Sequence, residues 1–340
     1  MWSLAHSSSH SSSGRFAPTP TGALHVGNAY SALLSIISAK AHGYSTILRI
    51  DDLDVKSIPL GCLESQLADL QWLGLQFDEG LKEGGHRGPY RQSARSDLYE
   101  SSIKYLNKKG LLYPCYCSRK EIAAVAPHAS DEGLIYPGTC RPKEATPLNL
   151  NEVRKHQIKG RLPTLRFNTS ALDLTLNDDA QASSSRLLRF DDLICGLQSA
   201  LLDTEVGDFV VQRRDGVYAY QLACAVDDYS QGCAIIARGA DLITSTHRQR
   251  LILSALDIPC EAMPQYAHAG LVVDSRGERL AKRNQSIQLS GLREAGVSPE
   301  SVCAALSRSL GGPDTHQIDL MVSAFKWSQV SSGPICWTLD

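Results

Sequence analysis

The stretch "RFAPTPTGALHVGN", residues 15–28, decides the fold. A strand-like start runs into a turn rich in proline and glycine, and an apolar helix follows from Asn28 onward. Such a turn presents backbone N–H groups and a helix N-terminus, which together favour a phosphate group. His25 stands just before the helix, where its imidazole could donate a hydrogen bond to an oxygen that gains charge. By itself the pattern is equally that of an ordinary turn.

The segments after this turn alternate between helix and strand patterns. Apolar residues at helical spacing predict helices over 28–42, 60–73 and 96–109. The stretch "YSTILRI" at 44–50 predicts a buried strand, and the acidic "DDLD" of 51–54 follows its end. The alternation predicts an α/β domain with a largely parallel sheet. Ligands of such sheets gather at the carboxyl ends of the strands.

Composition and punctuation divide the 340 residues into five parts. Proline-rich, short strand-like pieces and a cysteine group mark an insertion, after which the helix–strand rhythm returns. The expected parts are a disordered leader or non-native remnant at 1–13, the first half of the α/β domain at 14–112, the insertion at 113–205, the second half at 206–290, and a tail with one or two helical pieces at 291–340.

Hydrophobic content of 43% and charged content of 21% are typical of a globular protein with a core. A net charge of −2 argues against a protein that coats a polyanion, although a local basic face remains compatible with nucleic acid. The serine-rich start lacks the features of a secretory signal, and no long apolar run predicts a membrane span. Most of the ten cysteines are isolated in apolar surroundings, which favours a reducing, cytoplasmic location. We expect a monomer.

A second stretch, "ERLAKRNQS" at 278–286, is a basic and polar loop after a predicted strand. Arg279, Lys282 and Arg283 would bring positive charge to a polyphosphate. Taken alone, such a run is more often a solvated surface loop.

Taken together, the two stretches resemble a known arrangement. The "HVGN" at 25–28 resembles the HIGH motif, and "RLAKR" at 279–283 resembles the KMSKS motif, of class I aminoacyl-tRNA synthetases. Four ordered blocks resemble those of the glutamyl-tRNA synthetase family: "GRFAPTPTGALHVGN", "LRIDDLD", "RRDGVYAYQLACAVDD" and "ARGADLITSTHRQ". The resemblance implies a Rossmann-type class I catalytic domain, split by a zinc-containing insertion and without an anticodon-binding domain.

The resemblance implies an activity in which the α-carboxylate of glutamate attacks the α-phosphate of ATP, with Mg²⁺ accompanying the nucleotide. Positioning and charge stabilisation would supply most of the acceleration. The catalytic residues carried over are His25, Asn28 and Lys282. The ATP-binding set is His25, Gly27, Asn28, Arg279 and Lys282, and the glutamate-binding set is Arg15, Phe16, Ala17, Pro18, Thr19, Asp51, Tyr220 and Arg238.

Four positions depart from the family pattern. Asn28 replaces the last histidine of HIGH, Arg279 the first lysine of KMSKS and Ala281 its central serine. Asp51 is one methylene shorter than the usual glutamate. Asparagine still donates a hydrogen bond and arginine still carries charge, so these changes remain compatible with activity.

Cys115, Cys117 and Cys140 form the one clustered group of cysteines. Three thiolates are one ligand short of a closed tetrahedral zinc site, and three unpaired thiols are the alternative. The family resemblance implies Tyr136 as the fourth ligand, while His128 is the alternative that zinc chemistry favours. A structural zinc would hold together an insertion that has little core of its own.

Only 58 residues follow Lys282 (340 − 282), which are too few for the helical anticodon-binding region of the full family enzyme. The chain therefore resembles a truncated paralogue. Such a paralogue activates glutamate without tRNA and transfers it to the cyclopentenediol of queuosine at the wobble position of tRNA(Asp). The anticodon loop would then enter the active site, and the candidate basic contacts in the insertion are Arg119, Lys120, Arg141 and Lys143. A truncated synthetase that charges a tRNA 3′ end, and a silent tRNA- or nucleotide-binding paralogue, are the alternatives.

Overall fold

The computed structural model describes residues 12–125, 129–130, 133–172, 186–273 and 288–339. A six-stranded sheet in the order β2-β1-β10-β11-β7-β8 forms its centre. The first five strands are parallel, and only β8 runs antiparallel to its neighbour β7. The strands are β1 (Ser13–Phe16), β2 (Ser45–Leu48), β7 (Leu187–Asp192), β8 (Gly196–Leu201), β10 (Cys233–Gly239) and β11 (Gln265–Ala269). The expected α/β fold with a mostly parallel sheet is confirmed.

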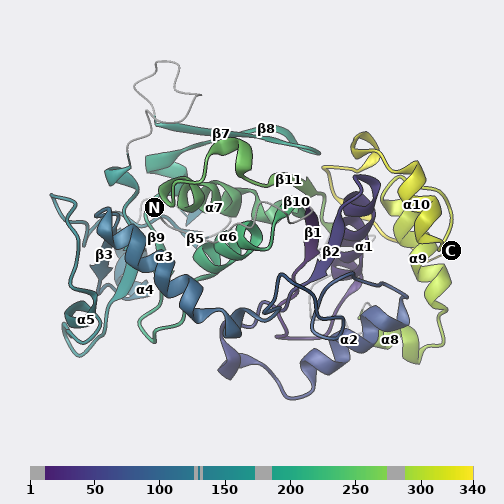
Figure 1. Cartoon of the computed structure of the whole chain (residues 1–340), viewed down its shortest axis with the longest axis horizontal. Helices are drawn as coiled ribbons and strands as arrows, with labels where there is room; N and C mark the ends of the chain where they lie inside the picture. Colours follow the sequence, from purple (N-terminus) through teal and green to yellow (C-terminus); the bar gives the residue numbers. More distant parts are fainter. Residues whose placement is uncertain (1–11, 126–128, 131–132, 173–185, 274–287, 340) are drawn as a thin grey trace.

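Helices cover both faces of this sheet (Figure 1). On β1, Gly14 faces α1 (Val26–Ala41), and a Cβ there would come within 2.8 Å of Ala39 Cβ. The next residue, Arg15, faces α6 (Tyr220–Ser230) on the opposite side. Successive strand side chains alternate between faces, so one residue step separates a packing contact from a functional one.

The helices expected from apolar spacing are present. Each begins and ends within a few residues of its predicted bounds, and the glycines that follow α1, α2 and α3 have positive φ angles of 72°, 68° and 71°, as a helix-terminating residue requires. Besides α1, these helices are α2 (Cys62–Trp72) and α3 (Ser96–Lys108). A further helix, α7 (Ile243–Ala255), lies in the second half of the α/β domain.

A smaller antiparallel sheet, β3-β6-β9, lies beside the main one, at the left of Figure 1. It consists of β3 (Leu112–Cys115), β6 (Thr164–Phe167) and β9 (Phe209–Gln212). Short elements complete this region: α4 (Arg119–Val125), α5 (Leu150–Val153), β4 (Ala129–Ser130) and β5 (Gly133–Leu134). Strand pairing crosses the predicted boundary at 205, because β9 pairs with β6 of the insertion while β7 and β8 extend the main sheet.

The last part of the chain packs against α1, beside the sheet (Figure 1). Apolar side chains of Val302, Leu306 and Met321 join the main core there. The elements are α8 (Leu289–Glu294), α9 (Pro299–Ser309) and α10 (Ile318–Ala324), with β13 (Ile335–Cys336) paired to β12 (Val272–Val273). The segment expected to be a tail with one or two helical pieces thus contributes to the main core.

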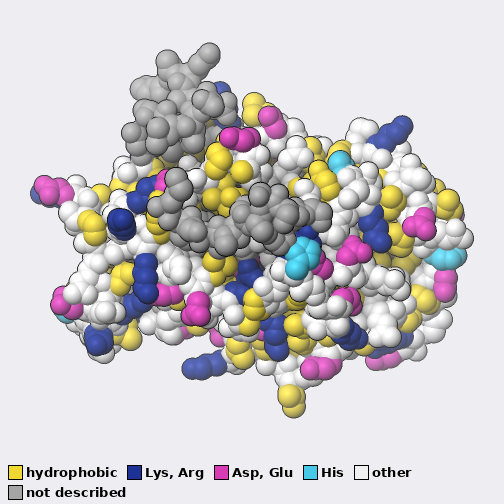
Figure 2. Space-filling view, viewed as in Figure 1, with side chains coloured by type: hydrophobic (Ala, Val, Ile, Leu, Met, Phe, Trp, Pro, Cys, Tyr) yellow, Lys and Arg dark blue, Asp and Glu magenta, His cyan; other side chains and the backbone are white. Residues whose placement is uncertain are grey.

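Charges of both signs share the surface. On the face in Figure 2, Lys and Arg side chains lie among Asp and Glu side chains, as the small net charge predicts. None of the helices in the described ranges has the length and hydropathy needed to cross a bilayer.

Candidate active site

The predicted site residues gather at the carboxyl ends of the parallel strands. Arg15 lies on β1, Asp51 follows β2, and Arg238 lies near the end of β10. The neighbouring strands β11 and β7 add His268 and Asp192 at the same edge. Strand β1 has β2, the next strand in the chain, as its neighbour on one side and β10 as its neighbour on the other. The strand order therefore reverses at β1, and α/β sheets bind ligands at such a point.

The turn after β1 is held by contacts that the sequence pattern does not reveal. Pro18 accepts a backbone hydrogen bond from Asp51 N at 3.0 Å. The Gln66 amide donates to the carbonyl oxygens of Thr19 at 3.2 Å and Gly22 at 2.7 Å. The ring of Phe16 stacks on Phe77. The predicted glutamate-binding segment 15–19 is therefore rigidly mounted between α2 and the strand that precedes Asp51.

The start of α1 shows why glycine and asparagine follow the histidine. A Cβ on Gly27 would lie 3.0 Å from His25 Cε1, so the imidazole ring packs directly over the glycine. The Asn28 side-chain oxygen accepts a hydrogen bond from His25 N at 3.0 Å. The side-chain carbonyl oxygen of Asn28 thus caps the helix, and its predicted contact with ATP stays a prediction. Its amide group remains the part that suits a nucleotide oxygen.

Described residues on either side of the undescribed range 274–287 lie next to this helix start. Gln288 forms a β-bridge with His25, and Leu289 N donates to Leu24 O at 3.0 Å. At the other end, Val272 lies beside Gly27. The predicted ATP-binding residues Arg279 and Lys282 fall outside the described residues, so their roles stay predictions.

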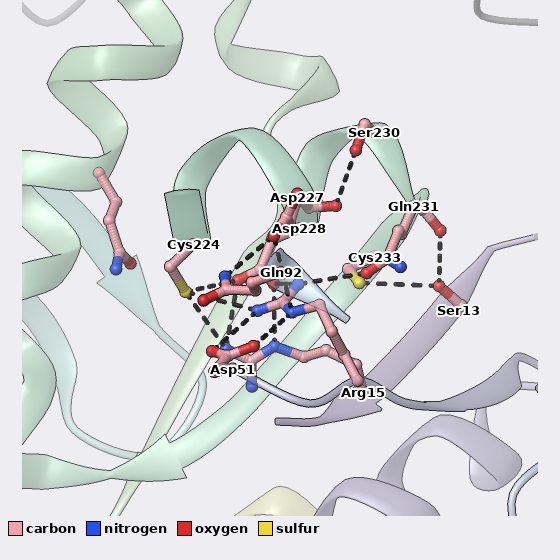
Figure 3. Close-up of polar contacts among 12 residues, drawn as sticks. Ser13, Arg15, Asp51, Gln92, Cys224, Asp227, Asp228, Ser230, Gln231 and Cys233 are labelled. Atoms are coloured by element: carbon pink, nitrogen blue, oxygen red, sulfur yellow. Dashed lines mark hydrogen bonds and ion pairs between the residues drawn. The ribbon is translucent and has the colours of Figure 1, made fainter. Parts of the chain in front are cut away.

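Arg15 is buried and already has an acidic partner. Its Nε and Nη2 donate to the Asp228 carboxylate at 3.1 and 3.2 Å. Arg49, with no exposed surface, donates to the same carboxylate at 2.6 Å and to Asp51 Oδ1 at 2.7 Å. Figure 3 shows Arg15 and Asp51 converging below Asp228 on α6. The predicted carboxylate binder and the predicted amine binder thus belong to one buried ionic cluster.

Sequence reasoning missed Arg49 and Asp228, which join the two predicted residues. Each carried a detectable pattern: Arg49 stands between the buried Leu48 and Ile50, and Asp228 ends the apolar helix run "LACAVDD". A charge in an apolar run needs a partner, because unpaired buried charge is costly. The partner itself, 179 residues away, is what spacing could not identify.

The ionic cluster shifts the pKa values of Asp51 and Asp228 in opposite directions. Burial raises the pKa of Asp51 to about 6, with Arg49 opposing and Asp227 and Asp228 adding to the rise. Burial also disfavours ionisation of Asp228, but Arg15 and Arg49 outweigh it and lower the pKa of this carboxyl below its usual range. Asp228 is therefore a fixed anion, while Asp51 changes charge within the range of ordinary assays.

Arg238 differs from the other buried arginines. It is 5% exposed and donates to Thr246 Oγ1 at 2.6 Å, Gln249 Oε1 at 2.8 Å and His268 Nε2 at 3.1 Å. Its Nη1 lies 3.4 Å from the hydroxyl of Tyr220. Among the hydrogen-bond partners described for it, none is a carboxylate, so its positive charge stays available to an anion.

Tyr220 lies at the centre of the predicted glutamate site. Its phenol is partly buried, and this desolvation raises its pKa, while Arg238, Arg15 and Asp51 interact with it electrostatically. A small molecule beside it would meet the Arg238 guanidinium, for which no acidic partner is found in the described ranges, and the Asp51 carboxylate, which can accept an ammonium group. This combination suits an amino acid.

The cysteine group forms a compact cluster in the insertion. The sulfurs of Cys115, Cys117 and Cys140 lie within 4.8 Å of one another, with Cys117 and Cys140 at 3.5 Å. The Tyr136 hydroxyl lies 3.4 Å from Cys115 Sγ and 3.6 Å from Cys117 Sγ. Zinc–sulfur bonds of about 2.3 Å place tetrahedral ligands about 3.8 Å apart, so these four groups fit one zinc ion. His128, the alternative fourth ligand, lies outside the described residues.

The basic residues predicted to contact tRNA lie around this cluster. Arg119 and Lys120 begin α4 and are exposed, as is Lys143. Arg141 instead pairs with the buried Asp208, its Nε donating at 2.6 Å. Arg141 therefore supports the insertion, whereas the other three present charge to solvent.

A family model described as "tRNA synthetases class I (E and Q), catalytic domain" matches residues 13–324. The chain belongs to this family of ligases.

Within it, the chain is 42% identical to a glutamyl-Q tRNA(Asp) synthetase of Symbiobacterium thermophilum, over 95% of this chain and 94% of the relative. It is 39% identical to a glutamyl-Q tRNA(Asp) synthetase of Nitratidesulfovibrio vulgaris, over 88% of this chain and 86% of the relative. A crystal structure of a glutamate tRNA ligase from Elizabethkingia meningosepticum, in complex with its amino acid, superposes with a TM-score of 0.77 and 25% identity, covering 97% of this chain and 68% of that one.

Proposed function

We propose that the protein activates L-glutamate with ATP and Mg²⁺ to glutamyl adenylate without needing tRNA. It then transfers the glutamyl group to the cyclopentenediol of queuosine at the wobble position of tRNA(Asp). Two relatives named glutamyl-Q tRNA(Asp) synthetase support this proposal, and they align over 94% and 86% of their own lengths.

The observation that carries the first step is the state of Arg238. A buried guanidinium whose described partners are all neutral lies beside the hydroxyl of Tyr220. One carboxylate of glutamate supplies the missing negative charge, and charge-assisted pairs with arginine are strong and directional. Arg15 is the candidate for the second carboxylate, which would share it with Asp228. Asp51, when ionised, accepts the ammonium group.

The chemistry asks little covalent participation from the protein. An oxygen of the glutamate α-carboxylate bonds to the α-phosphorus of ATP while the bond to the departing pyrophosphate breaks. The N-terminus of α1 and the imidazole of His25 lie at the end of the segment that carries Arg15, so one stretch reaches both reactants. Lys282 is proposed to stabilise charge on the departing pyrophosphate.

The insertion is proposed to hold one structural zinc through Cys115, Cys117, Cys140 and Tyr136. The fit of their spacing to a tetrahedron supports this. The ring of Tyr136 packs beneath the Arg166 guanidinium at 3.8 Å, which orients the phenol toward the sulfurs. Such a site would stabilise the region that joins β3 to β6.

For the second step, a hydroxyl of the acceptor attacks the mixed anhydride and adenylate leaves. Queuosine and a terminal ribose both present a cis-diol, so the catalytic centre alone does not select between them. The preference for queuosine is supported by the two named relatives. Charging of a tRNA 3′ end is the competing outcome.

The test uses radiolabelled glutamate, ATP and three preparations of tRNA(Asp): with queuosine, without queuosine, and with queuosine but lacking the 3′-terminal adenosine. We expect labelling of the first and third preparations only. Labelling that persists without queuosine but requires the 3′ adenosine would overturn the proposed acceptor and leave glutamate activation standing. Absence of labelling in all three, together with absence of adenylate, would identify a silent binding protein.

A further inference from the structure

A buried chain of hydrogen bonds runs from β7 through β11 to Arg238. The Asp192 Oδ2 atom lies 2.6 Å from His268 Nδ1, and His268 Nε2 lies 3.1 Å from Arg238 Nε. Neither Asp192 nor His268 has any side-chain exposure. The rings of Phe190 and Tyr266 pack at 6.2 Å from the imidazole and leave it one orientation.

The directions of these bonds determine where the protons are. Arg238 Nε can only donate, so His268 Nε2 must be the acceptor and carry no proton. The remaining ring proton is then on Nδ1 and points at Asp192. Burial lowers the pKa of His268, which keeps the ring neutral, and the neighbouring Arg238 acts in the same direction while Asp192 opposes it.

We propose that Asp192 and His268 are positioning residues for substrate binding: Asp192 selects the histidine tautomer, and the histidine in turn orients the Arg238 guanidinium toward the substrate carboxylate. The inference rests on the proposed binding of glutamate by Arg238. It assigns a role to β7, a strand from the segment that sequence reasoning treated wholly as an insertion. The acceptor that Arg238 meets in this hydrogen-bond chain is the neutral His268 ring. The contact therefore fixes the guanidinium but leaves its positive charge for the substrate carboxylate.

The second oxygen of Asp192 makes the idea testable with one isosteric change. Asp192 Oδ1 accepts backbone N–H groups from Ile194 at 3.0 Å, Cys195 at 2.8 Å and His268 at 3.1 Å. In Asp192→Asn the three backbone N–H donors require an acceptor, so the side-chain carbonyl oxygen must take the position of Oδ1. The NH₂ group then faces His268 Nδ1. The histidine must then place its proton on Nε2, where it opposes the Arg238 Nε–H.

The experiment measures dissociation constants of L-glutamate and of ATP by calorimetry on the full chain, with thermal unfolding as a folding control. Loss of one charge-assisted hydrogen bond and misorientation of the guanidinium should weaken glutamate binding by about tenfold or more in Asp192→Asn. ATP binding should change by less than about twofold. The matched control is Asp191→Asn, which makes the same change on an exposed neighbouring residue and should behave as wild type.

A second pair of variants separates positioning from packing. In His268→Gln the side-chain oxygen still accepts from Arg238 and the NH₂ group still donates to Asp192, so glutamate binding should be largely restored. In His268→Leu no acceptor remains, and binding should weaken as in Asp192→Asn. Equal affinities of the glutamine and leucine variants, or an unchanged affinity in Asp192→Asn, would overturn the inference. If wild-type protein binds no glutamate, the proposed function fails instead.

Discussion

Replacing Asp228 with asparagine should lower the free energy of unfolding by about 3–5 kcal/mol, because removing one partner of a buried ion pair leaves uncompensated charge. Asp228 accepts two hydrogen bonds from Arg15, at 3.1 and 3.2 Å, and one from Arg49 at 2.6 Å. Its side chain is 2% exposed, so water cannot replace the lost charge.

The magnitude follows from the charge balance of the cluster. Arg49 pairs with Asp51 at 2.7 Å, and Arg95 pairs with Asp227, so three guanidinium groups face three carboxylates. The asparagine variant leaves one positive charge in excess at a site where Arg49 has no contact with solvent. Exposed ion pairs contribute only about 0–1 kcal/mol, so burial accounts for most of the expected effect.

Urea unfolding at pH 7, followed by circular dichroism, measures the difference. Asp314→Asn is the control, because Asp314 pairs with Arg308 but is 68% exposed, and its loss should cost less than about 1 kcal/mol. The lowered pKa of Asp228 gives the sign of the pH dependence: its contribution is present above about pH 4 and is lost as the pH falls further. Equal destabilisation by the two substitutions at pH 7 would show that burial does not determine what the Asp228 ion pairs contribute to stability.

Four further predictions concern the site. Gly27→Ala places a methyl group 3.0 Å from His25 Cε1; it should slow glutamate-dependent pyrophosphate exchange without lowering the melting temperature, and unchanged exchange would contradict the ring's role. Because Asp51 ionises at about pH 6, the dissociation constant of glutamate should rise about tenfold per pH unit below that value, and Asp51→Asn should show no such rise. Metal analysis should find one zinc per chain, and Cys117→Ser should reduce that amount; no zinc in freshly prepared wild type would rule out the metal site. Lys282→Ala should abolish pyrophosphate exchange, and undiminished exchange would remove Lys282 from the mechanism.

Local sequence patterns predicted the main helices and strands, because the spacing of apolar residues in each element reflects which of its faces is buried. Helix α1 follows from apolar residues at helical spacing, and β2 from the short strand-like stretch "YSTILRI". One or two helical pieces were expected after residue 291, but their packing was not, because α10 has only seven residues and one buried side chain, Met321. The packing of α10 against α1 depends on the tertiary fold, and the sequence of so short a segment does not predict it.

The sequence predicted which residues to consider for the site, but not the contacts among them. Family resemblance identified Arg15, Asp51 and Arg238, yet two of these already pair with partners inside the protein. Only the folded chain brings Asp228 to Arg15, 213 residues earlier, and Asp192 to His268. Sequence spacing carries no information about such pairs, because the order of strands in the sheet determines them.

We propose above all that this protein activates glutamate without tRNA. Exchange of labelled pyrophosphate into ATP with the full chain, L-glutamate and Mg²⁺, in the absence of any tRNA, measures this activity. We expect exchange that depends on glutamate and is not supported by glutamine or aspartate. No exchange under these conditions, from a folded preparation that binds ATP, would contradict it.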